Sequence, residues 1–208
     1  MSDQASSLRL QRAQADYPPS FAFIGGEGSG VSTLVGELAA SLALRGGRPL
    51  LIEHQPGHQQ ARRLGLPATG TFASLAISLG GINELMVANR YGLNLINLAA
   101  SSEERTRLSP RLWRRLAHEF ASVEADSSVL LIDCPNISDD PSPACIADNL
   151  VLVLSPDADS LTQGYASLKR LAADYARRRF NILVNRAQDF EEAQAVFNRL
   201  NSVAGDYL

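Results

Sequence analysis

Lysine is almost missing from this 208-residue sequence, because Lys169 is the only one and the other 18 of its 19 basic residues are arginines. Cysteine is equally scarce. The two present, Cys134 and Cys145, argue against a disulfide framework and for reduced thiols. Neither an apolar run long enough for a membrane helix nor a secretory leader pattern occurs. A net charge of -3 gives no general attraction to nucleic acid or anionic membranes. These absences favour a globular, cytoplasmic protein.

Short apolar runs alternate with helical patterns along the chain, whose length suits one domain. The runs that predict strands are Phe21–Gly25, Pro49–Ile52, Leu93–Leu98, Val129–Asp133, Leu150–Leu154 and Phe180–Val184. The segments that predict helices are Ser32–Leu44, Gln59–Leu64, Phe72–Val87, Ser109–Ala121, Ser160–Arg178 and Phe190–Tyr207. This alternation predicts a single α/β domain, with a mostly parallel, doubly wound sheet and helices on both faces.

The N-terminal segment is set apart from the rest. Residues 1–16 carry a short helical pattern with a narrow apolar stripe, and Tyr17-Pro18-Pro19-Ser20 breaks that pattern. An isolated helix of this length is marginal in water, so we expect it to fold onto another surface. We therefore predict an N-terminal helix and linker over residues 1–19 and an α/β domain over residues 20–208.

The first predicted strand leads into a glycine-rich loop and then a helix. Gly25 and Gly30 have the spacing of the G-x-x-x-x-G-K-[ST] phosphate loop, but Val31 replaces its lysine. In such loops the backbone N–H groups attract phosphate, the lysine reaches the terminal phosphates and the hydroxyl holds a metal ion. Ser32 keeps the hydroxyl, whereas Val31 cannot neutralise charge and Glu27 repels phosphate. The alternative is that this stretch is merely a strand-to-helix turn.

An acid ends the apolar strand at Asp133, which is how phosphate-loop enzymes place a carboxylate beside the metal ion. Alternatively, Asp133 caps the next turn. Glu53, His54 and His58 could form a metal cluster, but the intervening Pro56-Gly57 breaks the helix that the histidine spacing would need. We therefore favour solvated loop histidines and predict no metal site.

This order of parts resembles the MinD/ParA class of P-loop NTPases, whose loop reads Lys-Gly-Gly-x-Gly-Lys-Thr-Thr. The resemblance places the signature lysine of that class at Gly26 and its phosphate-loop lysine at Val31, so both lysines are absent. The implied, degenerate nucleotide site consists of Gly25, Gly26, Gly28, Gly30, Val31, Ser32, Thr33, Glu53, Asp133 and Asn185. Removing one preorganised stabiliser of transition-state charge typically lowers a rate by about 10²–10³. We therefore expect weak or no binding of ATP and Mg²⁺, no catalytic residue in cis, and a pseudo-ATPase rather than an enzyme.

Within this class, the segment Asp3–Arg9 matches the N-terminal Asp-Gln-Ala-x-x-Leu-Arg motif of the FlhG/FleN flagellar-number regulators. Residues 193–200 and 204–208 are similar to the C-terminal region of that family. The resemblance implies a regulator of flagellar number and placement that binds the signal-recognition-particle-type GTPase FlhF and stimulates its GTP hydrolysis. The implied partner-binding residues are Asp3, Gln4, Ala5, Leu8 and Arg9, with Gln4 acting in trans at the active site of FlhF.

The same resemblance suggests further partners, namely a flagellar switch protein or a flagellar transcription regulator. Family members continue into a membrane-binding amphipathic helix, whereas this sequence stops at Leu208, so we expect no intrinsic membrane anchor. We also expect a monomer, since the lysine that couples nucleotide to dimerisation in the MinD class is missing. Partners would then recruit this cytoplasmic protein to the cell pole or membrane.

Two other functions stay open. The chain could be a working positioning ATPase of the MinD/ParA type that uses backbone amides, Ser32, Asp133 and an arginine from a neighbouring molecule. It could also be a DNA-partition protein, but the acidic pI of about 5.6 argues against DNA binding.

Overall fold

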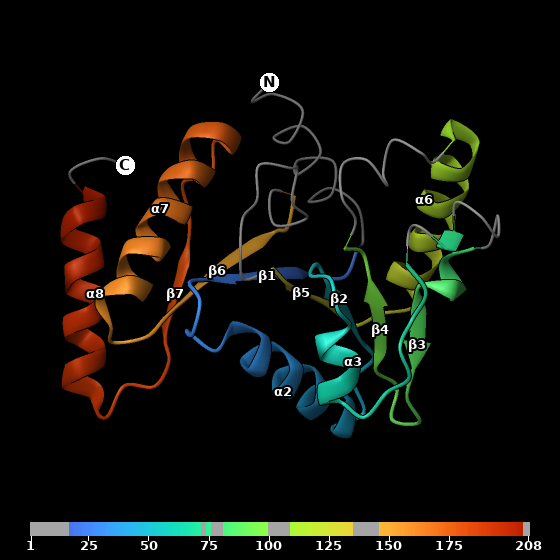
Figure 1. Ribbon diagram of the computed structural model, residues 1–208, viewed down its shortest axis with the longest axis horizontal. Helices are drawn as coiled ribbons and strands as arrows, with labels where there is room; N and C mark the ends of the chain where they lie inside the picture. Colours follow the sequence, from blue (N-terminus) through green and yellow to red (C-terminus); the bar gives the residue numbers. More distant parts are fainter. Residues whose placement is uncertain (1–16, 72–73, 76–80, 100–108, 135–145, 206–208) are drawn as a thin grey trace. The chain divides into compact units, whose positions relative to one another are not determined.

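The computed structural model describes residues 17–71, 74–75, 81–99, 109–134 and 146–205 (Figure 1). Seven strands form one sheet in the order β3-β4-β2-β5-β1-β6-β7. Their bounds are β1 Ser20–Gly25, β2 Pro49–Glu53, β3 Met86–Ala88, β4 Asn94–Asn97, β5 Val129–Asp133, β6 Asn149–Leu154 and β7 Asn181–Val184. The pairs β1–β6, β6–β7, β2–β4 and β2–β5 are parallel, and β3 runs antiparallel to β4. The predicted mostly parallel α/β sheet flanked by helices is confirmed.

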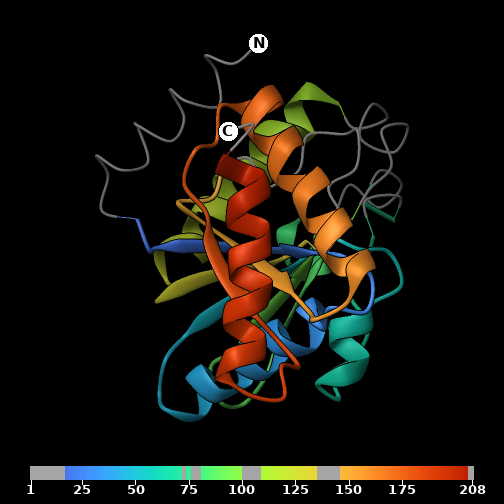
Figure 2. The same cartoon turned by 90° about the vertical axis from the view of Figure 1, so that its left-hand side faces the viewer.

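The chain divides into two compact units, which we describe separately. The first unit contains residues 21–34 and, in the C-terminal part, the described residues from Cys134 onward. It holds β1, β6 and β7, the first residues of α2 (Val31–Leu44), and the helices α7 (Ala158–Tyr175) and α8 (Phe190–Gly205). Helix α7 packs on β6 and on α8, and α8 packs on β7 (Figures 1 and 2).

Helix α7 lies close to the sheet because Gly164 has no side chain. A Cβ atom at Gly164 would lie 2.5 Å from Leu154 Cδ2 and 3.5 Å from Leu152 Cδ2, which is too close at the first contact for the helix to keep its position. The helix begins with Asp157 as N-cap, whose Oδ1 accepts a hydrogen bond of 2.7 Å from Ser160 N. The Ser155 hydroxyl donates to Asp157 Oδ2. This hydrogen bond above all, and then the one from Ser160 N, holds the pKa of Asp157 below its usual value.

Helix α7 ends earlier than the sequence pattern predicts. It stops at Tyr175, and Ala176 adopts the left-handed conformation that ends the helix. Arg177 is therefore outside the helix and buried, and it donates to Asp148 O at 3.4 Å. The run of three arginines at the end of this helical pattern, residues 177–179, predicts a solvated helix face. This prediction is wrong for Arg177, while Arg178 and Arg179 are exposed.

The second unit contains residues 17–20 and the described part of 35–133. It holds the rest of α2, the strands β2, β3, β4 and β5, and the helical segments α3 (Gln59–Arg63), η1 (Ile82–Glu84) and α6 (Pro110–Ala125). The strands β2, β4 and β5 have buried apolar interiors, as is typical of parallel strands covered on both faces, and each ends in a polar residue. The fully buried side chains of this core include Leu50, Leu51, Leu93, Leu95, Ile96 and Leu131.

The predicted helix Phe72–Val87 is wrong in its C-terminal part. Ile82–Glu84 forms a single 3-10 turn, and β3 then pairs with β4 through the turn that begins at Asn89. Asn89 Oδ1 accepts hydrogen bonds from Tyr91 N at 2.9 Å and from Leu93 N at 3.0 Å, so this side chain stabilises the hairpin turn together with the backbone hydrogen bonds. Pairing with a neighbouring strand outweighs the local helical spacing of apolar residues.

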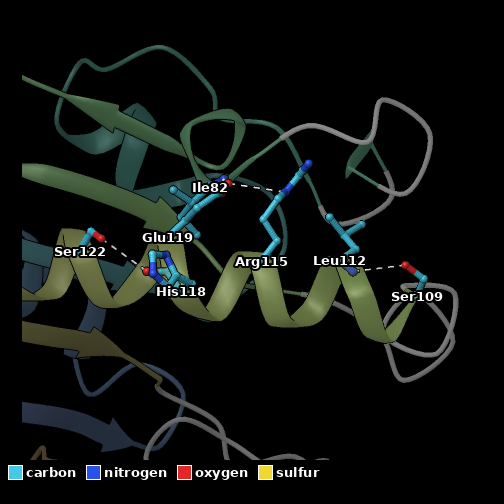
Figure 3. Close-up of polar contacts among 7 residues, drawn as sticks. All are labelled: Ile82, Ser109, Leu112, Arg115, His118, Glu119 and Ser122. Carbon is cyan, nitrogen blue, oxygen red and sulfur yellow. Dashed lines mark hydrogen bonds and ion pairs between the residues drawn. The ribbon is translucent and has the colours of Figure 1, made fainter.

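Helix α6 begins as the sequence predicts, with Ser109 as N-cap and Pro110 at the first helical position. The Ser109 hydroxyl accepts from Leu112 N at 3.2 Å (Figure 3). Further along the helix, Glu119 Oε2 accepts from Ile82 N at 2.7 Å and so fixes η1 against α6. The helical spacing predicts that Arg111, Arg114 and Arg115 face outward, and all three are exposed.

Several predictions fall outside the described residues. These are the N-terminal helix, the Asp3–Arg9 motif, Cys145 and the end of the last helix at Tyr207. Cys134 is described and buried, and it forms no disulfide with another described residue. Within the described ranges, no helix combines the length and the apolar composition needed to cross a membrane.

Candidate functional site, a glycine loop and a buried acid pair

The glycine loop of the first unit joins β1 to α2, as the sequence predicts. Gly25 allows the turn because a Cβ there would lie 2.5 Å from Val153 O and 2.7 Å from Ser29 Oγ. Ser29 is fully buried and closes the loop on itself, since its hydroxyl donates to Gly26 O at 2.7 Å and its N–H donates to the same oxygen at 3.2 Å. Hydrogen bonds within the loop therefore fix its shape.

The residue at the lysine position points into the core. Val31 is the first residue of α2 and only 2% exposed, so it fills space beneath the loop and contributes no charge. Ser32 follows half-buried and Thr33 exposed, both in the first turn of the helix. The hydroxyls that the sequence singles out are thus at the start of α2, where helix N–H groups point outward.

A glutamine from α7 contacts the loop. Gln163 Oε1 accepts a hydrogen bond of 2.8 Å from Glu27 N, and a Cβ at Gly26 would lie 2.7 Å from the same oxygen. The glutamine is exposed, and so is Glu27. A backbone N–H of the kind that binds phosphate in such loops is therefore already engaged by a side chain of the same unit.

The end of β7 also reaches the loop. Asn185 Nδ2 donates to Ser29 O at 2.9 Å, and Gly30, with φ +84°, leaves room for this amide. Arg186 follows in the left-handed conformation, with φ +62°. Its Nε and Nη2 would lie 3.8 and 3.9 Å from a Cβ at Gly30, so a guanidinium is close to the loop. The sequence analysis predicts Asn185 at this site but misses Arg186.

The acids of the predicted site lie together in the second unit. Glu53 and Asp133 are the last residues of the neighbouring parallel strands β2 and β5 and are paired in register. They are 0% and 1% exposed, respectively. Each accepts a hydrogen bond from an amide side chain: Asp133 Oδ2 from Gln60 Nε2 at 2.5 Å, and Glu53 Oε2 from Asn97 Nδ2 at 3.0 Å. We call Glu53, Gln60, Asn97 and Asp133 the acid cluster.

The two histidines that the sequence analysis considers lie in the same unit. His54 and His58 are half-buried, and His58 Nδ1 lies 3.3 Å from Thr69 Oγ1. His58 adopts the left-handed conformation at the start of α3, next to Gly57. Across the described ranges, no group of three or more His, Cys, Asp or Glu side chains is placed to hold a metal ion.

In each unit, a glutamine side chain thus bonds a residue of the predicted site. For phosphate to reach Glu27 N, Gln163 would have to move, and a cation at Asp133 Oδ2 would share that oxygen with Gln60. These two residues and Asn97 are not identified by the sequence analysis. Only Asn97 has a local signal, because it is a polar residue at the carboxyl end of an apolar strand.

The fold is that of the MinD-type P-loop ATPases. The chain superposes on the cell division ATPase MinD of Pyrococcus furiosus with a TM-score of 0.64 and 18% identity, over 88% of this chain and 79% of that one. The septum site-determining protein MinD of Pyrococcus horikoshii, whose structure is a complex with Mg-ADP, gives a TM-score of 0.62 and 19% identity, over 86% and 77% of the two chains.

In sequence, the chain is similar to the antiactivator FleN of Pseudomonas aeruginosa. The two share 26% identity over 191 residues, which are 90% of this chain and 68% of FleN. No protein-family model matches the chain. The predicted resemblance to the FlhG/FleN branch therefore has support at the level of a distant sequence similarity, within a MinD-like fold.

Proposed function

We propose that this protein is a catalytically degenerate, MinD-like regulator of flagellar number and placement. It binds an FlhF-type GTPase and stimulates GTP hydrolysis through Gln4 of its N-terminal segment. The observation that carries this proposal is the similarity to antiactivator FleN over 90% of the chain, together with the Asp3–Arg9 motif. A glutamine supplied in trans can orient attacking water, as the intrinsic glutamine of small GTPases does.

The loss of ATPase activity is supported by the contacts of the core. Val31 is apolar and buried where the lysine of a phosphate loop would stand, and Gln163 holds a loop N–H. Because the charge that stabilises bound phosphates is reduced, Mg-ATP and Mg-ADP should bind weakly or not at all. Calorimetry tests this, and a dissociation constant in the low micromolar range would contradict it. In that case sedimentation with and without ATP would test whether nucleotide also drives dimer formation, which the proposed monomer excludes.

The activator role is tested with the protein and with a peptide of residues 1–16, each added to GTP-loaded FlhF. Hydrolysis should accelerate with both. Gln4→Ala should remove most of the stimulation with little loss of binding, because it deletes the group that orients water. Gln11→Ala is the matched control, a glutamine of the same segment outside the motif, and should stimulate like the unchanged sequence. Leu8→Asp should weaken binding by placing a charge in an apolar contact.

If saturating peptide and protein both leave hydrolysis by FlhF unchanged, the activator role is wrong. The core would then have to act as a docking surface for another flagellar component, such as the switch protein or a transcription regulator. Recruitment of the cytoplasmic protein to the cell pole by these partners is part of the same proposal.

A second candidate function is a residual positioning ATPase. The observation that favours it is Arg186, whose guanidinium lies next to Gly30 and could supply a cation to phosphates in place of the missing lysine. In addition, the structure of MinD from P. horikoshii, which has a similar fold, is a complex with Mg-ADP. A filter-binding assay with ATP distinguishes the two functions. Binding that falls on Arg186→Ala but not on Arg199→Ala, an exposed arginine of α8, would favour the ATPase.

A further inference from the structure

The acid cluster holds two carboxylates away from water, so each needs other partners to replace its lost hydration. Glu53 and Asp133 end neighbouring strands in register and are at most 1% exposed. Carboxylates removed from water are stable only when they are hydrogen-bonded, paired with a cation or bound to a metal ion. Whether hydrogen-bond donors or a cation stabilise this pair therefore decides whether the site can respond to a ligand.

Gln60 connects both acids. Its backbone N–H donates to Glu53 Oε1 at 3.0 Å and its side-chain Nε2 donates to Asp133 Oδ2 at 2.5 Å. Gln60 is itself fully buried, although it lies on the short helix α3 between the exposed residues Gln59 and Arg62 and next to the buried Ala61. Hydrogen bonds to ionised acceptors are roughly twice as strong as neutral ones, so this residue stabilises the pair more than an ordinary amide contact would.

The surroundings are built to admit this side chain. A Cβ at Gly36 of α2 would lie 2.5 Å from Gln60 Oε1 and 3.0 Å from Arg63 Cδ, so only glycine leaves room for the amide and for α3. Asn97 completes the arrangement by donating to Glu53 Oε2 at 3.0 Å. Donors from α3 and β4 thus converge on the two acids, and packing against α2 holds the amide of Gln60 in place.

From this geometry we infer that Gln60 is a positioning residue that takes the place of a divalent cation between the two acids, with its backbone N–H on Glu53 and its side-chain amide on Asp133. The acid pair as it stands does not fit a metal ion: in the part of the chain that the structure describes, no third His, Cys, Asp or Glu joins the two acids as a ligand, and Asp133 Oδ2 already accepts from Gln60. The acid cluster and α3 consequently keep one arrangement whether or not metal or nucleotide is present. This inference rests on the proposed function, for which it means that the regulator acts constitutively and is not switched through this site.

The experiment measures Mn²⁺ binding by electron paramagnetic resonance and the melting temperature in EDTA and in excess Mn²⁺. The unchanged protein should bind no Mn²⁺ at the acid cluster and should melt at the same temperature in both solutions. Binding of Mn²⁺ by the unchanged protein that disappears in Asp133→Asn would overturn the inference. The comparison of melting temperatures needs only the unchanged protein, and a rise in its melting temperature with Mn²⁺ would also count against the inference.

Gln60→Glu replaces the amide with a third carboxylate of the same shape. Its melting temperature in EDTA should fall by about 5 °C or more and recover with Mn²⁺, because three buried acids need a cation. Its affinity for Mn²⁺ should exceed that of the control by at least about tenfold, since ligand charge tunes such sites. The control is Gln59→Glu, which adds the same charge at the exposed neighbouring position of α3.

If Gln60→Glu does not fold in EDTA, Gln60→Ala gives the second measurement, because it removes the side-chain donor without adding charge. Stabilisation of Gln60→Ala by Mn²⁺, and none of Gln59→Ala, supports the inference. The absence of any metal response in both Gln60 variants would overturn it. The GTPase assay with the peptide of residues 1–16 contains no acid cluster, so failure of the proposed activator role is detected separately.

Discussion

The glycine loop and the acid cluster are both held by a glutamine, but the two contacts differ in their access to water. Gln163 is exposed and bonds an exposed N–H, whereas Gln60 and its two carboxylate partners are at most 1% exposed. A surface hydrogen bond exchanges with water at little net cost, while a buried carboxylate that loses a donor keeps its desolvation penalty. The loop contact is therefore displaceable, and the acid cluster is part of the core.

The largest effect should follow from removing a donor of the acid cluster. Asn97→Ala leaves Glu53 Oε2 without the amide that donates to it at 3.0 Å. The free energy of unfolding should fall by about 3 kcal/mol, because the acceptor is a buried charge. Urea denaturation measures this. The control Asn83→Ala, at an exposed position of η1, should change little. Equal losses in the two variants would mean that Glu53 does not depend on Asn97.

Within the loop, Gly25→Ala should lower the free energy of unfolding more than Gly28→Ala, because the first substitution creates a steric clash and the second only an unfavourable backbone conformation. Gly25→Ala places a methyl group 2.5 Å from Val153 O and should cost about 2 kcal/mol of unfolding free energy. Gly28→Ala meets no atom within 4 Å, so only its φ of +79° opposes the substitution, at about 1 kcal/mol. The same denaturation experiment compares the two. A larger loss for Gly28→Ala would contradict the described shape of the loop.

An intermediate effect is expected at the exposed carboxylate that begins α7. Asp157→Ala removes the N-cap and should cost about 1 kcal/mol at neutral pH. Hydrogen bonds from the Ser155 hydroxyl and Ser160 N–H lower the pKa of Asp157 in the folded protein. The stabilisation is therefore complete above the unfolded-state pKa and disappears as the pH falls through the lower, folded-state pKa.

Thermal melts of Asp157→Ala and the unchanged protein should accordingly converge in acid. Asp159→Ala serves as the control, because this exposed acid lies in the same helical turn without being the N-cap. If the melting temperatures of Asp157→Ala and of the unchanged protein differ by the same amount down to strongly acidic pH, the charge of the carboxylate is not what stabilises the helix.

The smallest effect on stability is expected from Gln163→Ala, below about 0.5 kcal/mol, since the side chain is exposed. Hydrogen exchange at the Glu27 amide should nevertheless accelerate, because this N–H loses its acceptor at 2.8 Å. Gln194→Ala, an exposed glutamine on α8, should leave that amide unchanged. Unaltered exchange at Glu27 in Gln163→Ala would mean that the loop amide is protected in some other way.

The strands were predictable because continuous apolar runs are a local signal. The run Val129–Asp133 is β5 to the residue, and the glycine spacing correctly located the turn into α2. The strand β3 was missed because its pairing with β4 is not encoded in its own short sequence. The contacts of the site were missed for the same reason: Gln60 and Asp133 are 73 residues apart, and Gln163 and Glu27 are 136 apart. Only folding brings these pairs together.

Gly164 relates the packing of α7 to the chemistry of the loop. Its missing side chain sets the distance between α7 and β6, and the next residue back along the helix is Gln163, which reaches Glu27 N. A single added methyl group at Gly164 would lift the helix and withdraw the glutamine together, without altering any residue of the loop. The distance between α7 and β6 therefore controls whether Gln163 reaches the Glu27 N–H. A substitution at Gly164, outside the glycine loop, would expose this N–H to solvent and to phosphate.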